Sequence, residues 1–456
     1  MLQAIDPTTG HILRSVTPAT PQEVERTLAA AEAAWRDWRD AGFDARARVL
    51  RKAAQIMRED VERLALLMTE EMGKPKKEAI GEVNKSAWAA EHYAEYAQSY
   101  LATQRLASDA SSSYVRHEPL GVILGILPWN APFWLAFRFA APALMAGNAC
   151  VMKHDPHVPG CAAAIAEVFA RAGAPAGVFA NLPLETPRVE AVIRDERIQA
   201  VSFTGSERGG GAVAAIAASE IKHAVLELGG SDPAIVLADA NLEEAADVLT
   251  LSRIINAGQS CIAAKRILVE DAVYERFTEL MHTRLAHLKL GDPREDATDV
   301  GPIARPDLRD TLHRQVRESI AAGARCLLGG ELPAGPGYFY PVTLLADVTN
   351  DMPAAREETF GPVAALLRVA DEAEAVRVAN DTRYGLAASV WTTAARGEAI
   401  ATRLEAGQVA VNGIVKTDPR LPSGGIKRSG FGRELGPQGI HEFVNSKQVW
   451  VGPKVE

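Results

Sequence analysis

The sequence predicts an α/β protein with parallel sheets, and three observations support that class. Short β-rich runs alternate with Ala-rich helical segments of about 10 to 15 residues, which is typical of parallel βαβ units. Apolar residues make up 47% of the chain and charged residues 23%, as in ordinary globular proteins. The length of 456 residues is enough for two or three domains at about 150 residues each.

The region from residue 21 to residue 105 is predicted to be helical. Thr20 is placed to be the N-cap of the first helix, with Pro21 at the first helical position and Glu23 completing a capping box. Apolar residues then recur at three- and four-residue steps, and the same pattern continues from Ala45 to Leu67. We therefore expect consecutive helices before the strands begin.

The alternation of strands and helices falls into two series, divided near residues 229–231. The first series comprises runs at 111–130, 149–154, 161–173, 177–183, 189–195 and 198–205, and a helix from Gly210. The second comprises runs at 241–258, 265–270, 272–288, 308–323, 325–330, 371–380 and 387–393. The tail at 441–451 alternates like a strand, which could pair with another chain or join a sheet of its own chain.

The stretch from Leu120 to Met152 must be weighed as a membrane span, because Arg138 is its only charge. Prolines and a glycine break it into pieces shorter than the roughly 20 residues that a spanning helix needs. A buried strand, loop and helix is the better interpretation. The N-terminus lacks the basic and apolar regions of a signal peptide, so we expect no membrane association.

Charge and cysteine content narrow the function classes. The chain carries 49 basic and 58 acidic residues, a net charge of −9, which disfavours a sequence-independent grip on nucleic acid. Four cysteines in a chain of this length are not a disulfide framework, and their spacing does not match a zinc site. We therefore expect a cytoplasmic protein with no metal and no nucleic-acid partner.

Three residues are candidates for catalytic chemistry. Cys261, in NAGQSCIAAKR, is followed by Lys265 and Arg266, cations that would lower the pKa of a thiol nucleophile. Glu227 ends an apolar strand, where partial burial would raise the pKa of a carboxylate toward that of a working base. Asn130 lies on a proline-bounded loop, where its amide could stabilise an oxyanion. Viewed singly, a buried thiol, a solvated strand-end acid and a turn residue explain them at least as well.

A phosphate-binding turn is predicted at FTGSERGG, between a strand and an Ala-rich helix. Gly205 and Ser206 stand there at a helix N-terminus, which suits a pyrophosphate. Lys153 ends the strand ACVMK and Glu358 lies in REETFGPV, and each could also be an ordinary surface charge.

In their order along the chain, these motifs together resemble the aldehyde dehydrogenase superfamily. The resemblance rests on LPWN, VMK, FTGS, LELGG, GQSC, EETFGP and SGGIKRSGFGRELG, and it covers practically the whole chain. The segments KHDPHVPGC, VLELGGSDP, NGIVKTDPRLP and KRSGFGREL are most similar to bacterial short-type NAD(P)-dependent succinate-semialdehyde dehydrogenases.

The resemblance implies an aldehyde dehydrogenase fold of three parts. A Rossmann-like NAD(P)-binding domain would comprise residues 1–105 and 119–229, and an α/β catalytic domain residues 230–430. A small β arm, residues 106–118 and 440–456, would assemble the chain into a homodimer or homotetramer.

The resemblance also implies a role for each site residue. Cys261 would be the nucleophile, Glu227 the general base that activates water, and Glu434 a second acid that relays protons. Asn130 and the backbone N–H of Cys261 would stabilise the oxyanion. The residues implied in binding NAD or NADP are Trp129, Asn130, Lys153, Pro156, Gly205, Ser206, Leu228, Glu358 and Phe360.

Two departures from the family pattern concern the cofactor and the substrate tunnel. Pro156 replaces a glutamate that binds the adenosine ribose in many NAD-preferring relatives, so nothing repels the phosphate of NADP. Lys153 and His154 are near enough in sequence to favour that phosphate. Ala131 and Ser423 replace two phenylalanines of the tunnel, which leaves its size open.

The implied substrate is a small aldehyde, in the first place succinate semialdehyde, which would be oxidised to succinate. Arg138 would bind its far carboxylate, because a buried guanidinium needs an anionic partner and its planar fork suits a carboxylate. Thr417 matches a hydroxyl that the similar enzymes use on the same carboxylate, and Arg420 is a candidate second cation. The alternative is that Arg138 pairs with an internal acid and does not contact the substrate.

Other functions stay open at this stage. The substrate could be another semialdehyde or small aldehyde. A CoA-acylating relative would need no water-activating base, so Glu227 disfavours that reaction. A catalytically idle scaffold is disfavoured by the intact set of Cys261, Glu227 and Asn130.

Overall fold

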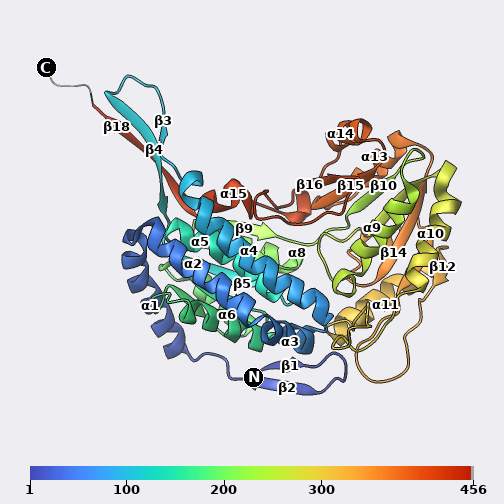
Figure 1. Ribbon diagram of the computed structural model, residues 1–456, viewed down its shortest axis with the longest axis horizontal. Coiled ribbons are helices and arrows are strands. Elements are labelled where there is room, and N and C mark those ends of the chain that lie inside the picture. The colour runs from blue at the N-terminus through green and yellow to red at the C-terminus, as the bar shows by residue number, and fades with distance from the viewer. Residues whose placement is uncertain (453–456) are drawn as a thin grey trace.

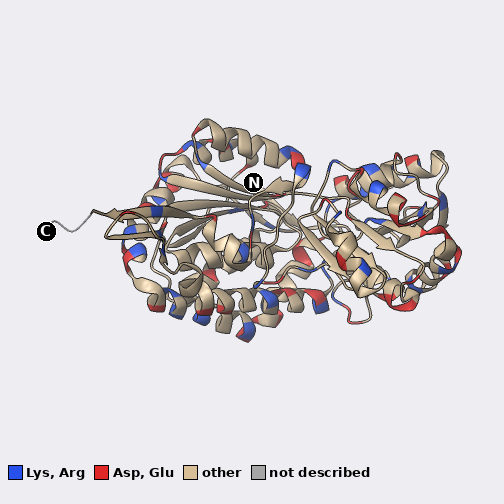
Figure 2. Ribbon diagram, turned by 90° about the horizontal axis from the view of Figure 1, so that it is seen from above, with Lys and Arg blue, Asp and Glu red and all other residues tan. Residues whose placement is uncertain are grey.

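The computed structural model describes residues 1–452, which form two α/β units and a protruding β arm (Figure 1). One unit is built on a six-stranded sheet and the other on a seven-stranded sheet. Each sheet is mostly parallel with helices between successive strands, as the sequence predicts. Charged residues gather on helices and loops, and the strands are largely free of them (Figure 2).

A hairpin and four helices precede the two large sheets. The hairpin pairs β1 (Leu2–Ile5) with β2 (Ile12–Val16). The helices are α1 (Pro21–Asp40), α2 (Gly42–Glu59), α3 (Val61–Met72) and α4 (Lys76–Tyr100). The predicted capping box is present at α1, where the Thr20 side chain accepts from the backbone N–H of Glu23 at 3.2 Å and Glu23 Oε2 accepts from that of Thr20 at 2.7 Å.

The six-stranded sheet has the strand order β17-β9-β8-β5-β6-β7. Its strands are β5 (Val122–Leu127), β6 (Ala149–His154), β7 (Phe179–Asn181), β8 (Ile198–Thr204), β9 (His223–Glu227) and β17 (Gly430–Phe431). Its helices are α5 (Pro132–Ala146), α6 (Pro159–Arg171), the 3-10 helix η1 (Thr186–Arg188), α7 (Val189–Arg194) and α8 (Glu207–Ser219). Only β17 runs antiparallel to its neighbour, so the other strands end at one edge, where α/β proteins bind ligands.

The apolar stretch from Leu120 to Met152 folds as β5, α5 and most of β6, as predicted. Pro132 stands in the first turn of α5, and Gly147 ends the helix in a left-handed conformation with φ 98°. None of the helices within residues 1–452 has the length and apolar character needed to cross a membrane.

The seven-stranded sheet has the order β12-β13-β14-β11-β10-β15-β16 and is parallel except between β12 and β13. Its strands are β10 (Pro233–Val236), β11 (Arg266–Glu270), β12 (Arg325–Leu328), β13 (Thr343–Ala346), β14 (Val363–Val369), β15 (Ala387–Trp391) and β16 (Gln408–Val411). Its helices are α9 (Leu242–Ile254), η2 (Ile255–Gly258), η3 (Asp271–Val273), α10 (Tyr274–Ala286), α11 (Pro306–Ala321), α12 (Pro353–Arg356), α13 (Glu372–Asn380) and α14 (Ala394–Ala401).

The helix predicted at 241–258 is shorter in the structure, because α9 ends at Ile254. Asn256 and Ala257 follow with φ values of 55° and 52°, left-handed conformations that cost energy for residues with a side chain. The backbone N–H of Asn256 donates to Glu78 Oε2 of α4 at 2.7 Å, which helps to hold this turn. The chain is thereby redirected immediately before the loop that carries Cys261.

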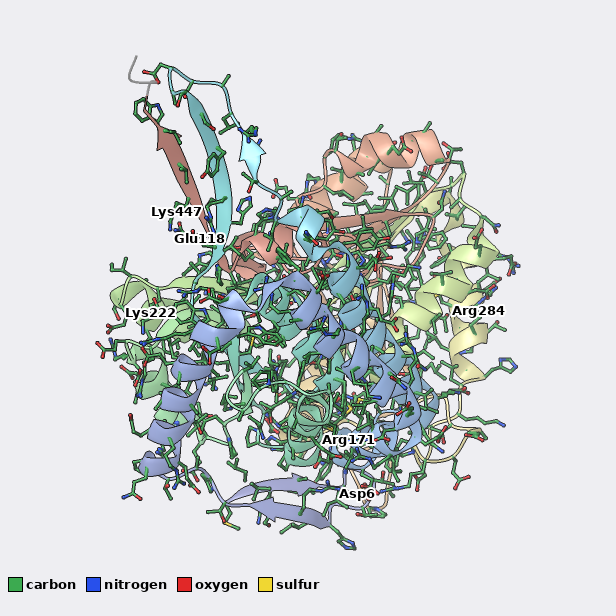
Figure 3. The ribbon with its side chains drawn as sticks, turned by 60° about the vertical axis from the view of Figure 1, so that its left-hand side comes forward. Asp6, Glu118, Arg171, Lys222, Arg284 and Lys447 are labelled. Carbon is green, nitrogen blue, oxygen red and sulfur yellow. The ribbon has the colours of Figure 1, made fainter. Side chains whose placement is uncertain are left out.

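The arm is a three-stranded antiparallel sheet of β3 (Gln104–Arg105), β4 (Ser112–Pro119) and β18 (Val444–Val451), in the order β18-β4-β3. The tail therefore pairs with a strand of its own chain, one of the two arrangements expected from its pattern. Lys447 of β18 also forms an ion pair with Glu118 of β4 (Figure 3). Two short helices, η4 (Lys427–Ser429) and α15 (Gly436–His441), lie in the chain between β16 of the seven-stranded sheet and β18 of the arm. The domain boundaries stay a prediction.

Candidate active site

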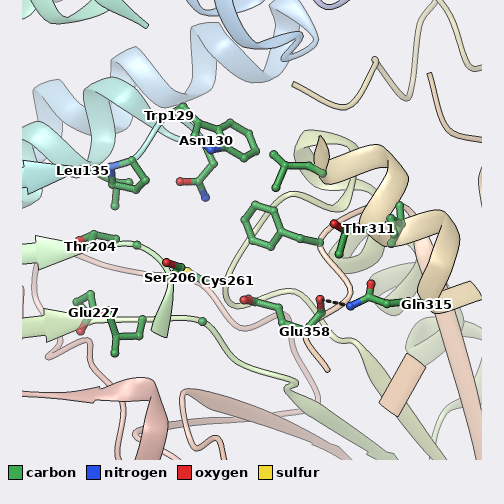
Figure 4. Close-up of a pocket in the computed structure, with 17 residues that line it drawn as sticks. Trp129, Asn130, Leu135, Thr204, Ser206, Glu227, Cys261, Thr311, Gln315 and Glu358 are labelled. Carbon is green, nitrogen blue, oxygen red and sulfur yellow. Dashed lines mark hydrogen bonds between the residues drawn. The ribbon is translucent and has the colours of Figure 1, made fainter. Parts of the chain in front are cut away.

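A cavity of about 270 Å³ lies between the two α/β units, at the carboxyl edge of the six-stranded sheet (Figure 4). It is lined by Pro128, Trp129, Asn130, Leu135, Thr204, Gly205, Ser206, Glu227, Leu228, Gly229, Cys261, Leu308, Thr311, Leu312, Gln315, Glu358 and Phe360. Nine of these are residues that the sequence assigns to the site, and they include Cys261, Glu227 and Asn130. Six other predicted residues lie outside this lining: Arg138, Lys153, Pro156, Thr417, Arg420 and Glu434.

Cys261 lies on the loop that joins η2 to β11, in the seven-stranded unit. The buried side chain of Lys265 donates to the carbonyl oxygens of Cys261 and, at 3.0 Å, of Ser260. Arg266, the other cation expected beside the thiol, instead donates to the carbonyl oxygen of Ser231 at 2.9 Å. Lys265 therefore fixes the backbone of the nucleophile loop, while Arg266 binds elsewhere.

Burial raises the pKa of the Cys261 thiol to about 11, although the charges of Arg138 and Lys265 oppose the rise. The expectation of a lowered thiol pKa is wrong in sign, because the loss of solvation outweighs the nearby cations. Cys261 is thus protonated at neutral pH and must give its proton to a base before it can act as a nucleophile. The carboxylate of Glu227 is close enough to influence the same thiol.

Asn130 lies between β5 and α5 and is held by both α/β units. Its backbone carbonyl accepts from Lys74 Nζ at 3.0 Å and from Asn256 Nδ2 at 2.8 Å. Its side-chain Nδ2 donates to the carbonyl oxygen of Gln259 at 3.2 Å, two residues before Cys261. The amide predicted to stabilise an oxyanion is therefore fixed beside the nucleophile loop.

A buried ion pair between Lys74 and Glu82 supports the Asn130 loop. Glu82 Oε1 accepts from the backbone N–H groups of Phe133, at 3.0 Å, and Trp134, at 3.1 Å. A carboxylate at these N–H groups caps the N-terminus of α5 and complements the helix dipole. The pair from α3–α4 thus orders the loop that leads into α5.

Glu227 ends β9, and its side chain is buried. Its Oε2 lies 3.4 Å from Arg138 Nη2, and its Oε1 has no hydrogen-bond partner among the residues that the structure describes. Burial raises the pKa of Glu227 to about 7, and the charge of Glu434 adds to the rise, while Arg138 and Arg433 oppose it. A carboxylate that gains and loses a proton near neutrality, with one free oxygen, suits a general base.

Arg138 pairs with two internal acids. Its Nε forms an ion pair with Glu434, in addition to the contact of Nη2 with Glu227. Glu434 Oε1 also accepts from the Ser202 hydroxyl at 3.1 Å. The guanidinium is therefore not an unpaired buried charge, as was assumed from the sequence. It has the internal acidic partners that the alternative interpretation predicted. Its role toward a substrate carboxylate stays a prediction.

The turn at Gly205 and Ser206 lies between β8 and α8, as predicted. Ser206 is the N-cap of α8, and its side chain accepts from the backbone N–H of Gly209 at 3.2 Å. After the adjacent strand β9, Gly230 N–H donates to Glu358 Oε1 at 3.1 Å. A Cβ added at Gly229 would overlap the Glu358 carboxylate, so the strand-end glycine leaves room for this acid.

Aromatic and polar side chains complete the cavity. The rings of Trp129 and Phe360 meet edge to face, with centroids 5.8 Å apart. Gln315 Nε2 donates to the carbonyl oxygen of Glu358 at 3.1 Å, which ties α11 to the cavity wall (Figure 4). The buried hydroxyl of Thr204 has no hydrogen-bond partner within residues 1–452. A glycine turn at a helix N-terminus, apolar walls, an unpaired hydroxyl and an acid together fit a bound dinucleotide.

Lys153 lies near the end of β6, and Pro156 lies two residues beyond the strand. Lys153 is buried, and no ion pair is formed by it within residues 1–452, so it is free to bind an anion or a hydroxyl. His154, in contrast, donates from Nε2 to the carbonyl oxygen of Pro132 at 3.2 Å, and its Nδ1 accepts from the backbone N–H of Asp155. Burial lowers the pKa of His154 to about 4, which disfavours the cationic role toward a phosphate expected for this residue.

Thr417 and Arg420 lie on the loop that faces α4. Thr417 Oγ1 accepts from Lys85 Nζ at 2.7 Å. Arg420 is exposed, pairs with Asp418 at 2.7 Å and lies over the ring of Trp88. Lys85 is a residue that sequence reasoning missed. The available signal was its position three residues after the buried Glu82, on the side of α4 that packs inward.

The sequence matches the family model "Aldehyde dehydrogenase family" over residues 1–449. The chain belongs to the aldehyde dehydrogenase family, and the predicted resemblance is confirmed. The match to almost the whole chain agrees with a site that draws on both α/β units.

Two relatives and one solved structure illustrate the similarity. A probable NADP(+) succinate-semialdehyde dehydrogenase of Synechocystis sp. is 48% identical and covers 99% of both chains. An NAD(P)+ succinate semialdehyde dehydrogenase of Escherichia coli is 46% identical, over 98% of this chain and 97% of its own. The crystal structure of a succinic semialdehyde dehydrogenase from Streptococcus pyogenes in complex with NADP+ superposes with a TM-score of 0.97, at 36% identity over 99% of this chain and 100% of that one. The predicted aldehyde dehydrogenase fold is thereby confirmed.

The buried pair of Lys74 and Glu82 gives a prediction for stability. Replacing Glu82 with glutamine leaves Lys74 charged without its counter-charge, so we expect Glu82→Gln to lower the free energy of unfolding by about 3 kcal/mol. Urea unfolding followed by tryptophan fluorescence measures the change.

The matched control is Glu62→Gln, which removes the acid of the exposed ion pair between Lys76 and Glu62. Exposed pairs contribute little, so we expect a change of less than about 1 kcal/mol for this control. Equal losses of stability in the two variants would contradict the proposed importance of the buried pair.

Proposed function

We propose that this aldehyde dehydrogenase oxidises succinate semialdehyde to succinate with NAD(P)+. The observation that carries the proposal is the convergence of Cys261, Asn130 and Glu227 on one cavity, beside the residues that fit a dinucleotide. The named relatives support the substrate, since proteins of that activity are up to 48% identical over nearly the whole chain.

In the first step Cys261 attacks the aldehyde. Glu227 accepts the thiol proton, the sulfur bonds to the carbonyl carbon, and the carbonyl oxygen becomes an oxyanion. Asn130 Nδ2 and the backbone N–H of Cys261 donate to that oxyanion, and a fixed donor of this kind contributes about 3 kcal/mol to the transition state. The support of Asn130 by Lys74 and Asn256 keeps the donor in place beforehand.

The cofactor residues hold NAD(P)+ beside the sulfur. We assign its pyrophosphate to Gly205 and Ser206, its adenosine ribose to Lys153, and its nicotinamide ribose to Glu358. When bound, NAD(P)+ would supply the oxidant: it would accept the hydride that leaves the carbon bonded to the Cys261 sulfur, and a thioester would remain on that sulfur.

In the last step Glu227 acts on water. Glu227 first passes the thiol proton onward and is ionised again. It then removes a proton from the water that attacks the thioester carbon, the C–S bond breaks, and the carboxylic acid leaves while Cys261 is released as a thiolate. We assign the onward transfer of the proton to Glu434, an assignment supported by the pairing of both acids with Arg138. A CoA-acylating relative would need no base to activate water, and a scaffold would need no base at all, so the proposed role of Glu227 in hydrolysis disfavours both alternatives.

Arg138 is proposed to meet the carboxylate of the substrate through its remaining nitrogen. Nε and Nη2 contact Glu434 and Glu227, which leaves Nη1 as a donor.

The protruding sheet of β3, β4 and β18 supports the proposal of a homodimer or homotetramer, because its edge strand β18 exposes Trp450 and Val451 (Figure 1).

The order of the two chemical steps gives a prediction for two variants. Cys261→Ala should abolish aldehyde oxidation, because no thioester can form. Glu227→Gln should give a slow burst of reduced cofactor close to one equivalent per site, followed by little turnover, because water is no longer activated. Stopped-flow absorbance at the reduced-nicotinamide band measures both. Normal turnover by a folded, cofactor-binding Cys261→Ala variant would disprove the assigned nucleophile.

The raised pKa of Glu227 gives a prediction for pH. The base must be ionised, so hydrolysis of the acyl-enzyme should fall as the pH drops below about 7, by about tenfold per unit. Single-turnover release of succinate between about pH 5 and pH 9 measures the profile. The Glu227→Gln variant should lose this dependence along with most of the rate, and a flat profile in the unmodified enzyme would contradict the assigned base.

The replacement of the ribose-binding acid by Pro156 gives a prediction for the cofactor. The enzyme should use NADP+, because Lys153 offers a positive charge and Pro156 offers no repulsion to the 2′-phosphate. Pro156→Glu should shift the ratio of kcat/KM values toward NAD+ by about tenfold or more. Titration of each cofactor against intrinsic fluorescence gives the same comparison without turnover. An enzyme that is inert with NADP+ would overturn this assignment. So would a Pro156→Glu variant whose preference between the two cofactors is unchanged.

A further inference from the structure

Lys85 is a partly buried cation on α4, and it packs against Trp134 in the first turn of α5. Its Nζ lies 4.2 Å from the centre of the Trp134 ring and donates to Thr417 Oγ1 at 2.7 Å. Trp134 precedes Arg138 by one helical turn on α5. Lys85 thus contacts Thr417 from a separate segment and packs on α5 one turn before Arg138, whose charge influences the pKa of Lys85.

The acids near Lys85 are already engaged with other cations. Glu82 pairs with Lys74, and Asp418 pairs with Arg420. Within the described part of the chain, residues 1–452, Lys85 itself forms no ion pair. A partly buried ammonium without a counter-ion is unusual unless a ligand supplies one.

Arg138 can offer its Nη1 to a substrate carboxylate, but its cluster carries no net positive charge. Its single guanidinium is balanced by the two carboxylates of Glu227 and Glu434. An anionic group that approaches Arg138 therefore meets a cluster with no net positive charge. Lys85, whose pKa is influenced by the charge of Arg138, is close enough to contribute the missing cation.

Thr417 is suited to act together with Lys85. Because its Oγ1 accepts from Lys85 Nζ, the hydrogen of its own hydroxyl is available to donate to another acceptor. The ammonium of Lys85 has further N–H donors of its own. Two adjacent donors of this kind match the two oxygens of a carboxylate.

We propose that Lys85, together with Thr417, binds the carboxylate of the aldehyde substrate and so makes the enzyme selective for ω-carboxy aldehydes. The inference rests on the proposed function, which it deepens by naming a residue that selects the substrate. Arg420 is the less suitable second cation, because it is exposed and paired with Asp418. Lys85 thus takes the place that the sequence assigned to Arg420.

The same residue makes substrate binding sensitive to pH. Burial lowers the pKa of Lys85 to about 8. Of the charged groups around it, Arg138 and Lys416 add to the lowering, whereas Glu82 and Asp418 oppose it. Lys85 therefore loses its charge as the pH rises through about 8, and the affinity for an anionic aldehyde falls with it.

The test compares succinate semialdehyde with butanal, an uncharged aldehyde of the same chain length. Lys85→Met keeps the length and the apolar contact with Trp134 but removes the charge. We expect its KM for succinate semialdehyde to rise about 10- to 100-fold, and its KM for butanal to change less than about twofold. Lys416→Met, which removes an exposed positive charge beside Thr417, is the matched control and should change both KM values less than about twofold.

Two further measurements separate selection from packing. Succinate should inhibit butanal oxidation competitively in the unmodified enzyme, and its inhibition constant should rise in Lys85→Met by the same factor as the KM. Lys85→Arg should restore tight binding and remove the weakening above about pH 8, because the guanidinium stays charged.

The outcomes distinguish the inference from the proposed function. Equal effects of Lys85→Met on the two aldehydes would show that Lys85 only packs against Trp134, and no effect on either would show that it has no role in binding. Either result overturns the inference while the function stands. An unmodified enzyme that shows no preference for succinate semialdehyde over butanal would overturn the proposed function and this inference with it.

Discussion

The active site depends on the burial of one guanidinium. Arg138 lies on α5 with almost no exposed surface, and a buried charge is tolerated only where opposite charges meet it. Glu227 at the end of β9 and Glu434 after β17 meet it, so three separate segments are drawn to one point. The same cation opposes the rise in the pKa values of Glu227 and Cys261, so one side chain outside the cavity influences the protonation of both groups.

A second constraint is that the reacting groups come from two different sheets. Asn130 and Glu227 follow strands of the six-stranded sheet, whereas Cys261 and Glu358 belong to the seven-stranded unit. The contacts of Asn256 with Asn130 and Glu78 bridge the two units, and they use a strained left-handed turn to do so. Asn256 thus ties the segment before Cys261 to Asn130 and Glu78 of the other unit.

Local features of this protein can be predicted from the sequence, and those that depend on tertiary contacts cannot. The capping box at Thr20 and the strand, loop and helix of residues 120–152 follow from neighbouring residues, and the structure has both. The order of the motifs predicted the family, and it predicted that Asn130 belongs to one site with Cys261 and Glu227. The structure places these three residues around one cavity. The partners of Arg138 could not be predicted, because Glu227 and Glu434 are 89 and 296 residues away in sequence. Lys85 has the sequence context of an ordinary helical lysine, and only the structure shows its contact with Thr417.

The placement of the reacting groups on two sheets has a consequence for heat inactivation. Each unit has its own buried apolar core, so each can keep its helices and strands when the contact between them loosens. A separation of thiol and amide by about 1 Å is enough to cost most of the rate. A loosened contact between the units is therefore expected to reduce catalysis before the helices and strands within each unit are lost.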